Sequence, residues 1–170
     1  MQLTSKRIRH KRKHRTNRVL YGLKLGFFGG LIWGATHWLL YAIHFTKVIP
    51  GFLIEPFFRH AFLKTGWGQL AGLGSFVIFS IAATYLYMLI LGRLRGPRWG
   101  ILYGGVWWLV IFIWLGPLIG ITEPYYKIGY DTLATELSIY LLWGLFIGYT
   151  IAFEFHDEAT REPKEAAGAY

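Results

Sequence analysis

The chain has 170 residues, of which 54% are hydrophobic, 19% aromatic and only 16% charged, and it carries a net charge of +9 without a single cysteine. Soluble domains normally contain about 25% charged residues, so this composition excludes an ordinary soluble domain and leaves a small integral membrane protein. The lack of cysteine excludes disulfides and the common zinc and iron–sulfur ligand sets.

The positive charge is concentrated in residues 1–18, which contain no acid. Eight basic side chains lie there: Lys6, Arg7, Arg9, Lys11, Arg12, Lys13, Arg15 and Arg18. We expect this segment to be a solvated basic arm that contacts anionic lipid headgroups, with each Lys or Arg contributing about 1 kcal/mol. RNA or a protein partner is the alternative. Because the arm lacks aromatic side chains for base stacking, we expect no specific nucleic-acid ligand.

Four apolar segments follow, over about residues 19–44, 67–91, 99–121 and 132–153. Each is long enough to cross a hydrocarbon core of roughly 30 Å as a helix. The first is too long for a cleaved signal peptide, and none shows the short alternating pattern of barrel strands. The sequence therefore predicts an all-α membrane protein with a four-helix transmembrane domain over residues 19–155 and a polar tail over residues 156–170.

Lys and Arg in the short connections predict the orientation. One side holds the basic arm, Arg93, Arg95 and Arg98 in a tight turn, and Arg161 and Lys164 in the tail. The other side holds only Lys47, Arg59, Lys64 and Lys127. Because cytoplasmic loops carry the excess of Lys and Arg, we expect both termini in the cytoplasm.

The first outer loop predicts a short interfacial helix between Pro56 and Lys64. Phe57, Phe58, Ala61 and Phe62 share one face of this helix, and Arg59, His60 and Lys64 share the other. Pro56 suits a first helical turn, and Glu55 is placed to pair with Arg59 four residues later. We expect this helix to lie on the membrane surface, with a lid over a cavity as the alternative.

Glycines recur at four-residue spacing in every span. They are Gly22, Gly26, Gly30 and Gly34 in the first span, Gly68 and Gly72 in the second, Gly100, Gly104, Gly116 and Gly120 in the third, and Gly144 and Gly148 in the fourth. Small residues on one face let two helix backbones approach closely in lipid. We interpret these glycines as helix-packing seams, with a partner helix in the same chain favoured over a second copy of the chain.

Two ionisable residues inside the spans form a candidate intramembrane polar site, Glu136 and His37. Ionisable groups at membrane depth are functional candidates by default. Glu136 is expected near the outer interface and His37 deeper, where a neutral hydrogen-bonded histidine is the simpler interpretation and a proton relay would need an acid facing it. Gly116–Pro117 should kink the third span near its outer end.

No catalytic, cofactor or metal motif is present. The sequence lacks H-E-x-x-H, the P-loop, G-x-S-x-G and the G-x-G-x-x-G dinucleotide pattern. We therefore assign no catalytic, cofactor-binding or metal-binding residue, and we expect the protein not to be an enzyme.

Three stretches resemble one known family: LIWGATHWLLYAIHFTKVIP (31–50), YGGVWW (103–108) and LLWGLFIGYTIAFEFHDE (141–158). They are similar to the YqhR family, small membrane proteins of spore-forming Gram-positive bacteria, from the first span through Glu158. The resemblance implies a plasma-membrane location and supports four spans, but it provides no catalytic residue.

The residues together favour a non-enzymatic structural or interaction module in the plasma membrane, with a homo-oligomer or another membrane protein as candidate partner. The alternative is a small transporter or channel subunit that uses Glu136, His37 and the break at Gly116–Pro117.

Overall fold

The computed structural model describes residues 17–92, 94 and 96–156, and this part of the chain contains helices and no strand. Four helical segments among these residues are long and apolar enough to cross a membrane. They are α1 (Arg18–Ala42), α3 (Gly66–Ile90), a third segment over Arg98–Ile119, and α7 (Tyr130–His156). The predicted all-α, four-span fold is confirmed, and its bounds agree with the predicted ranges to within one helical turn.

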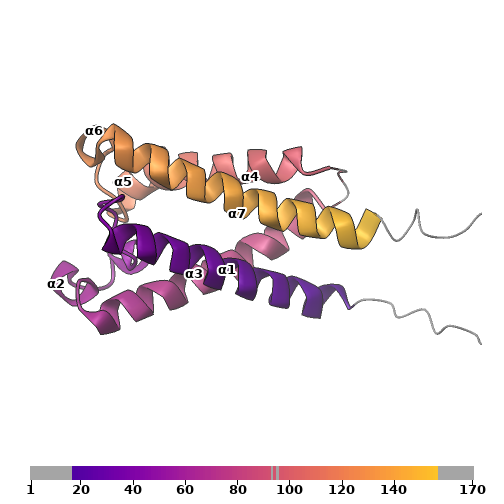
Figure 1. The fold of residues 1–170 in the computed structure, drawn as a ribbon, viewed down its shortest axis with the longest axis horizontal. Helices are drawn as coiled ribbons and strands as arrows, with labels where there is room; N and C mark the ends of the chain where they lie inside the picture. Colours follow the sequence, from indigo (N-terminus) through magenta and orange to yellow (C-terminus); the bar gives the residue numbers. More distant parts are fainter. Residues whose placement is uncertain (1–16, 93, 95, 157–170) are drawn as a thin grey trace, which may run out of the picture.

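All but the last two residues of the predicted basic arm, and all of the predicted tail except His156, lie outside the described residues. The start of α1 and the end of α7 lie together at one end of the bundle, which we call the terminus end (Figure 1). The two longer connections, which carry residues 43–65 and 120–129, lie at the other end, which we call the loop end.

The third span is three helical pieces: α4 (Arg98–Trp108), the π-helical η2 (Leu109–Trp114) and α5 (Leu115–Ile119). Proline lacks the N–H that would bond four residues back, and its ring crowds that carbonyl. The wider π turns precede Pro117, and the Leu115 N–H bonds the Val110 carbonyl five residues back. The expected irregularity at Gly116–Pro117 thus takes the form of a π segment, an element often found at functional sites.

The four spans pack as two antiparallel pairs, α1 with α3 and α4 with α7, and α1 also contacts α7 (Figure 1). In the first pair the glycine stripe of α1 lies against α3. A Cβ atom added at Gly26 would lie 2.5 Å from Ile81 Cα, and one at Gly30 would lie 2.6 Å from Val77 Cα. Gly22 and Gly34, also on α1, face side chains of α3. These backbone approaches leave no room for a side chain at Gly26 or Gly30.

Glycine meets glycine in the second pair. Gly100 and Gly104 of α4 lie directly against Gly144 and Gly148 of α7, where an added Cβ would overlap backbone atoms of the facing helix. Such proximity maximises dispersion contacts between two helices in a solvent that provides little hydrophobic drive.

Four of the predicted seam glycines have other surroundings. Gly68 and Gly72 of α3 contact the first loop, at Phe62–Leu63 and Pro50–Gly51, rather than another span. A Cβ at Gly116, in α5, would overlap the carbonyl oxygen of Ile111 in the preceding π segment, so glycine there lets α5 follow the irregular turn. Gly120 has no atom within 4 Å of an added Cβ; with φ 75° it ends α5 in the left-handed conformation.

Aromatic rings fill the space between the two helix pairs. Trp143 of α7 is fully buried, and its ring lies within 6.3 Å, centroid to centroid, of Phe76 and Phe79 on α3 and Tyr103 on α4. Two hydrogen bonds cross this layer: Trp143 Nε1 donates to Ser80 Oγ at 3.0 Å, and Tyr103 Oη donates to the Ala83 carbonyl at 2.6 Å. Large rings are used where the helices stand apart, and glycine where they touch.

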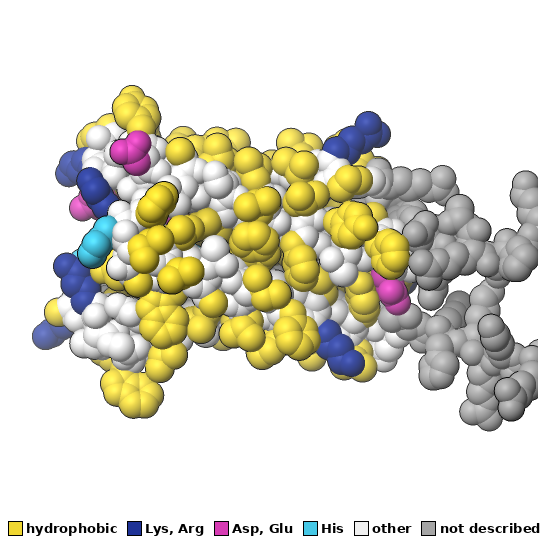
Figure 2. Space-filling view, viewed as in Figure 1, with side chains coloured by type: hydrophobic (Ala, Val, Ile, Leu, Met, Phe, Trp, Pro, Cys, Tyr) yellow, Lys and Arg dark blue, Asp and Glu magenta, His cyan; other side chains and the backbone are white. Residues whose placement is uncertain are grey.

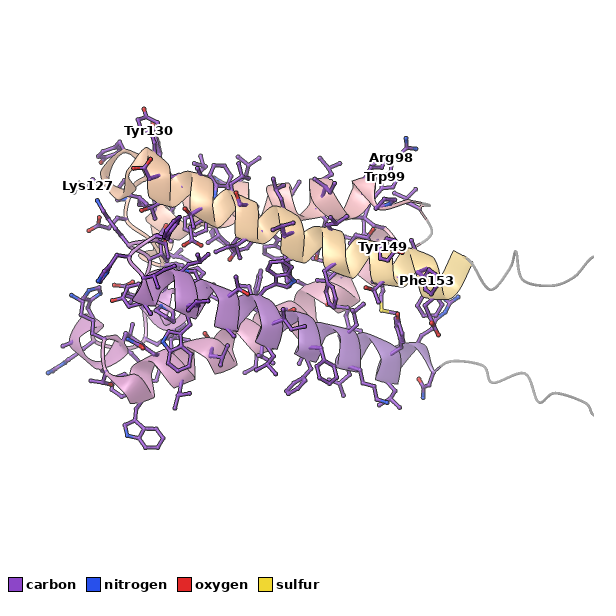
Figure 3. The ribbon with its side chains drawn as sticks, viewed as in Figure 1. Arg98, Trp99, Lys127, Tyr130, Tyr149 and Phe153 are labelled. Carbon is purple, nitrogen blue, oxygen red and sulfur yellow. The ribbon has the colours of Figure 1, made fainter. Side chains whose placement is uncertain are left out.

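Apolar and charged side chains are distributed over the molecular surface as expected of a membrane protein. Hydrophobic side chains cover the length of the bundle in Figure 2, and charged side chains gather at its two ends. Lys127 and Tyr130 lie at the loop end, whereas Arg98 and Trp99 lie at the terminus end (Figure 3). Exposed aromatic residues at the loop end, such as Trp67 and the 91% exposed Tyr130, suit the headgroup level of a bilayer.

We expect Gly26→Leu and Gly30→Leu each to disrupt folding, because a side chain at either position would meet the backbone of α3. Loss of the monodisperse peak and of the thermal transition in detergent is the measurement. Gly74→Leu is the matched control on α3, since nothing lies within 4 Å of a Cβ there. If all three variants unfolded at the wild-type temperature, the α1–α3 contact would be wrong.

Candidate intramembrane polar site at the loop end

The polypeptide reverses direction immediately after α1. The N–H of Phe45 bonds the Leu40 carbonyl at 2.9 Å, and the N–H of His44 bonds the Tyr41 carbonyl at 3.1 Å. These two bonds form a Schellman motif, whose left-handed position is usually glycine. Here it is His44, with φ 61°. The reversal directs Thr46 back into the bundle, where its side chain is only 2% exposed.

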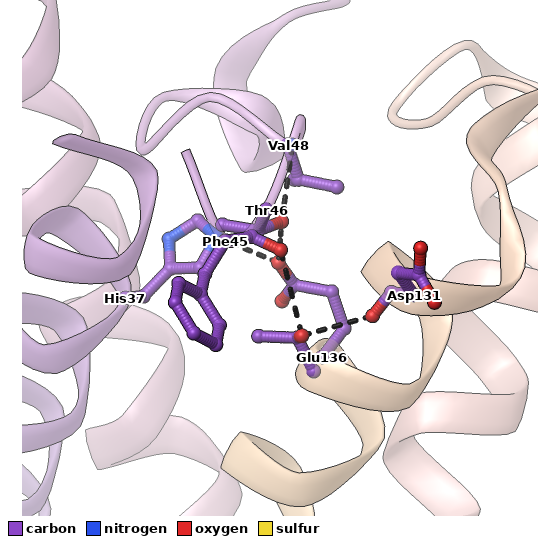
Figure 4. Close-up of polar contacts among 7 residues, drawn as sticks. His37, Phe45, Thr46, Val48, Asp131 and Glu136 are labelled. Carbon is purple, nitrogen blue, oxygen red and sulfur yellow. Dashed lines mark hydrogen bonds and ion pairs between the residues drawn. The ribbon is translucent and has the colours of Figure 1, made fainter. Parts of the chain in front are cut away.

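Glu136 lies on α7 facing this reversal and is 1% exposed. Its Oε1 accepts a short hydrogen bond from Thr46 Oγ1 and lies 3.0 Å from His37 Nε2, and His37 itself is 4% exposed (Figure 4). A buried carboxyl without such partners would be strongly disfavoured in a low-dielectric interior. The cluster therefore joins α1, the first loop and α7 at one carboxyl oxygen.

Neighbouring hydrogen bonds fix the same corner. The N–H of Val48 donates to Thr46 Oγ1 at 3.2 Å, so the Thr46 hydroxyl both donates and accepts (Figure 4). Thr135 Oγ1, next to Glu136, lies 2.9 Å from the Asp131 carbonyl and 3.5 Å from the Phe45 carbonyl. Two adjacent residues of α7, Thr135 and Glu136, thus attach the first loop to this helix.

Aromatic rings enclose the inner side of the cluster. Phe52, in the short 3-10 helix η1 (Phe52–Ile54), packs edge-on against His37 with ring centroids 5.6 Å apart. Phe112, in the π segment, lies 5.9 Å from both Phe52 and Tyr140. The π segment thus contributes the fully buried ring of Phe112, which completes the enclosure.

A cavity of about 420 Å³ at the loop end has Phe52 among its lining residues, and we call it the outer cavity because the sequence predicts that this end faces outward. Its walls come from the first loop and from the connection that contains α6 (Tyr125–Ile128). Basic and acidic side chains line it together: Lys47, His60, Lys127, Glu55 and Glu123. Glu136, His37 and Thr46 are not among its lining residues, whereas Val48 and Phe52, which contact Thr46 and His37, are.

The first loop differs in detail from the sequence prediction. Its α2 helix covers only His60–Leu63, because a turn over residues 55–57, a bend at Phe58 and an extended Arg59 precede it. The carboxylate of Glu55 contacts His60 Nδ1 at 2.6 Å rather than the predicted partner Arg59. Phe57 is 82% exposed, as suits a residue at a membrane surface. The turn at Pro56 thus replaces the first turn of the predicted helix.

Sequence reasoning missed three residues of this corner: Thr46, Phe52 and Tyr140. Thr46 follows a helix end without a glycine, and the other two resemble ordinary core aromatics, so no local signal marks them. Of the predicted lipid-contacting residues only Arg18 is described; its guanidinium carbon lies 5.3 Å from the ring centroid of Phe155. Lys6, Arg7, Arg9, Lys11, Arg12, Lys13 and Arg15 lie outside the described residues.

The corner contains a carboxyl, an imidazole and hydroxyl groups, which can exchange protons or bind a small polar ligand. No group of three or more His, Cys, Asp or Glu side chains suited to a metal ion occurs within residues 17–92, 94 and 96–156. Polar groups that join helices inside four apolar spans define a polytopic α-helical membrane protein.

The chain belongs to the YqhR family: the family model described as "Conserved membrane protein YqhR" matches residues 4–166. The chain is also 34% identical over 145 residues to the uncharacterized protein YqhR of Bacillus subtilis (strain 168), a match that covers 85% of this chain and 82% of that protein. No solved structure matches the chain. The family resemblance expected from the three sequence stretches is therefore confirmed.

We expect His37→Ala and Glu136→Ala each to lower the unfolding free energy, and the double variant to lose less than the sum of the two. Each single change leaves a buried polar partner unpaired, whereas the double change removes both. Polar contacts between membrane helices couple by about 0.6–2 kcal/mol. Reversible unfolding in mixed micelles would measure the coupling, and additive losses would contradict the contact.

Proposed function

We propose that this protein resides in the bacterial plasma membrane with both termini in the cytoplasm, and that it is a non-enzymatic interaction module that binds a membrane-protein partner at its outer face. The observation that carries the proposal is the fixed conformation of the first loop. Thr46 is bonded to Glu136, and the backbone at Gly51 touches Gly72. A surface that is ordered before binding loses less entropy when a partner docks.

The way the polar groups are used supports a binding role over catalysis. Glu136, His37 and Thr46 are each at most 4% exposed, and their hydrogen bonds hold separate segments together. A catalytic acid or base must reach the proton of a bound substrate, within hydrogen-bond distance or through one water. The groups that a partner meets instead are the charged side chains around the outer cavity, including Lys47 and Lys127.

The charge distribution supports the orientation. The basic arm precedes α1 in the sequence, and the start of α1 lies at the terminus end together with Arg98, whereas Lys47, Arg59, Lys64 and Lys127 belong to the loop end. The excess of Lys and Arg at the terminus end favours the cytoplasm for that end. The basic arm then lies beside the anionic lipids of the inner leaflet, which supports lipid contact as its role.

Because the chain has no native cysteine, single-cysteine variants test the orientation directly. We expect Lys127→Cys to react with a membrane-impermeant maleimide in intact protoplasts, and Leu94→Cys, in the tight turn, to react only after permeabilisation. Both residues are exposed in the bundle, so accessibility from each side decides the result. The reverse pattern would place both termini outside.

The partner can be sought by crosslinking and co-purification from native membranes at the native expression level. We expect a recurrent membrane-protein partner whose yield falls several-fold in Lys47→Gln plus Lys127→Gln, because rim charges steer association. Lys24→Gln is the control, because Lys24 is an exposed lysine near the start of α1, away from the loop end. A wild-type protein that is always recovered alone would contradict the interaction role.

A second candidate function is a small transporter or channel subunit. The contact between His37 and Glu136 favours it, since an acid facing an imidazole at membrane depth can accept and release a proton. The π segment and Pro117 lie in the span beside this corner. The hydrogen bonding of the helix changes there from the α to the π pattern, an irregularity often found at functional sites.

For this second candidate we expect Glu136→Gln and His37→Ala to abolish any proton-linked solute uptake in proteoliposomes or cells while assembly stays normal. Glu123→Gln, an exposed acid at the cavity rim, is the matched control and should keep uptake unchanged. Uptake that survives both buried-site variants would rule out transport through this corner.

A further inference from the structure

The lining of the outer cavity is apolar on one side and charged on the other. Its apolar residues Ile49, Phe52 and Ile128 are each at most 5% exposed. The exposed members of the lining are charged or titratable: Lys47, His60, Glu123 and Lys127. The closed side of the cavity is therefore apolar and its open side is polar. A volume of about 420 Å³ lies within the range of small-molecule pockets, about 300–1,000 Å³.

Each wall of the cavity contributes charges of both signs. The first loop provides Lys47 and Glu55, and the connection over residues 120–129, which we call the second connection, provides Glu123 and Lys127. Basic and acidic side chains gather together at this end of the molecule in Figure 2. The formal charges of the two lysines and the two glutamates cancel, and His60 is charged only if it is protonated.

Only part of this charge is already paired within the chain. Glu55 Oε1 lies 2.6 Å from His60 Nδ1. In the part of the chain that the structure describes, no ion pair within 4.0 Å joins Lys47, Glu123 or Lys127 to an oppositely charged group. This holds even for Glu123 and Lys127, which stand four positions apart in one short connection. Two cations and one carboxylate thus remain at the open side of the cavity.

Both walls of the cavity are fixed from inside the bundle. Thr46, which precedes Lys47, is hydrogen-bonded to Glu136 of α7. On the other wall, Thr122 Oγ1 donates to the Ile111 carbonyl of the π segment at 3.3 Å. A cavity whose walls are ordered before binding loses less entropy when a small ligand enters it.

The charges and the apolar side together select the chemistry of a ligand. A ligand with only a negative charge would meet the unpaired Glu123, and a ligand with only a positive charge would meet the two lysines. A zwitterion provides both signs, so each of its charged groups finds a charge-assisted hydrogen bond. The closed side of the cavity adds an apolar body to this description, because apolar surface is stabilised by burial against apolar surface.

We propose that the outer cavity binds a small amphipathic zwitterion, either an apolar amino acid or a short peptide with free ends. The carboxylate of the ligand binds Lys47 and Lys127, one from each wall, and its ammonium group pairs with Glu123. Its apolar side chain packs against Phe52, whose ring also contacts His37. This ligand goes beyond the partner protein proposed above, because one chain contains the whole site.

A zwitterionic lipid headgroup is the competing occupant of the cavity. Exposed aromatic residues at the loop end, such as Trp67 at 78% and Tyr130 at 91%, indicate that this end lies at the level of the headgroups. A headgroup has the same two charges, but it lacks an apolar body to fill the closed side of the cavity. The apolar lining therefore favours the amino acid or peptide.

Fluorine NMR of para-fluorophenylalanine with the full chain in lipid nanodiscs tests the proposal. We expect a concentration-dependent broadening of the fluorine signal that empty nanodiscs do not produce. Unlabelled phenylalanine and the dipeptide leucyl-phenylalanine should reverse the broadening, and the stronger of the two shows whether a free amino acid or a peptide is the better ligand. A signal no broader than with empty nanodiscs at millimolar concentration, or broadening that neither compound reverses, would overturn the proposal.

Four further competitors test the parts of the ligand. N-acetylphenylalanine lacks the ammonium group, phenylalaninamide lacks the carboxylate, and glycine lacks the apolar body, so each should compete several-fold more weakly than phenylalanine. Phosphoethanolamine, a zwitterionic headgroup, should compete as weakly as glycine. Competition as strong as that of phenylalanine by either blocked compound or by glycine would overturn the proposed ligand. Strong competition by phosphoethanolamine would assign the cavity to a lipid headgroup instead.

Variants of exposed side chains test the charged contacts without disturbing the core. Lys47→Gln, Lys127→Gln and Glu123→Gln should each weaken the binding of phenylalanine about fivefold, the effect of one exposed ion pair. Lys64→Gln and Asp131→Asn are the matched controls, because both residues are exposed at the loop end and neither lines the cavity. Unchanged affinity in the three lining variants, or an equal loss in the controls, would overturn the assignment of the charges.

The amide provides a second control for the lysines. Because phenylalaninamide has no carboxylate, it should bind Lys127→Gln, changed at the loop end (Figure 3), no more weakly than it binds the wild type. A loss of amide binding as large as the loss of phenylalanine binding would mean that the lysine does not contact the carboxylate, which contradicts the proposal.

The ligand site and the proposed function can fail separately, because the NMR measurement contains no partner protein and no transport step. Ligand binding by a chain that is always recovered alone would leave the ligand site standing and remove the interaction role. A recurrent partner without ligand binding would remove the site and leave the interaction role standing.

Discussion

The architecture depends on how closely helix backbones approach one another where water provides no hydrophobic drive. Within lipid, leucine-rich faces gain little by meeting, so contact must come from dispersion and from hydrogen bonds. Gly26 and Gly30 let α1 approach α3, and Gly100 and Gly144 do the same for α4 and α7. These contacts define two rigid pairs. The distance between the pairs is then set by the thickness of the aromatic layer around Trp143.

Glu136 is tolerated because of this division into two pairs. The glycine contacts lie within each pair, so the contact between pairs is where polar side chains face one another: Ser80 with Trp143 at mid-depth, and His37 with Glu136 near the loop end. Hydrogen bonds depend on direction, so these contacts fix the orientation of one helix pair relative to the other. Packing of aromatic rings alone would define that orientation less sharply. Thr46 extends this specification to the loop that covers them.

The sequence predicted the four spans, because length and hydropathy determine them, and the local spacing of its glycines marked the faces that meet in the α1–α3 and α4–α7 pairs. It singled out Glu136 and His37, since ionisable residues in apolar spans are uncommon. The sequence could not predict the contact between Glu136 and His37, because that contact depends on the register between two helices that begin more than a hundred positions apart. The same holds for Gly68 and Gly72, whose spacing resembles a helix seam while their neighbours belong to a loop.

The pairing of neighbouring spans bears on how the chain is made. Each glycine seam joins a span to the next one along the chain, so α1 and α3 can close as a helical hairpin while the second half is still on the ribosome. The α4–α7 hairpin can close in the same way, which leaves the aromatic layer between the pairs as the last contact to form. In that order every contact before the final docking joins neighbouring spans, and contacts that are close in the sequence form at the smallest cost in loop-closure entropy.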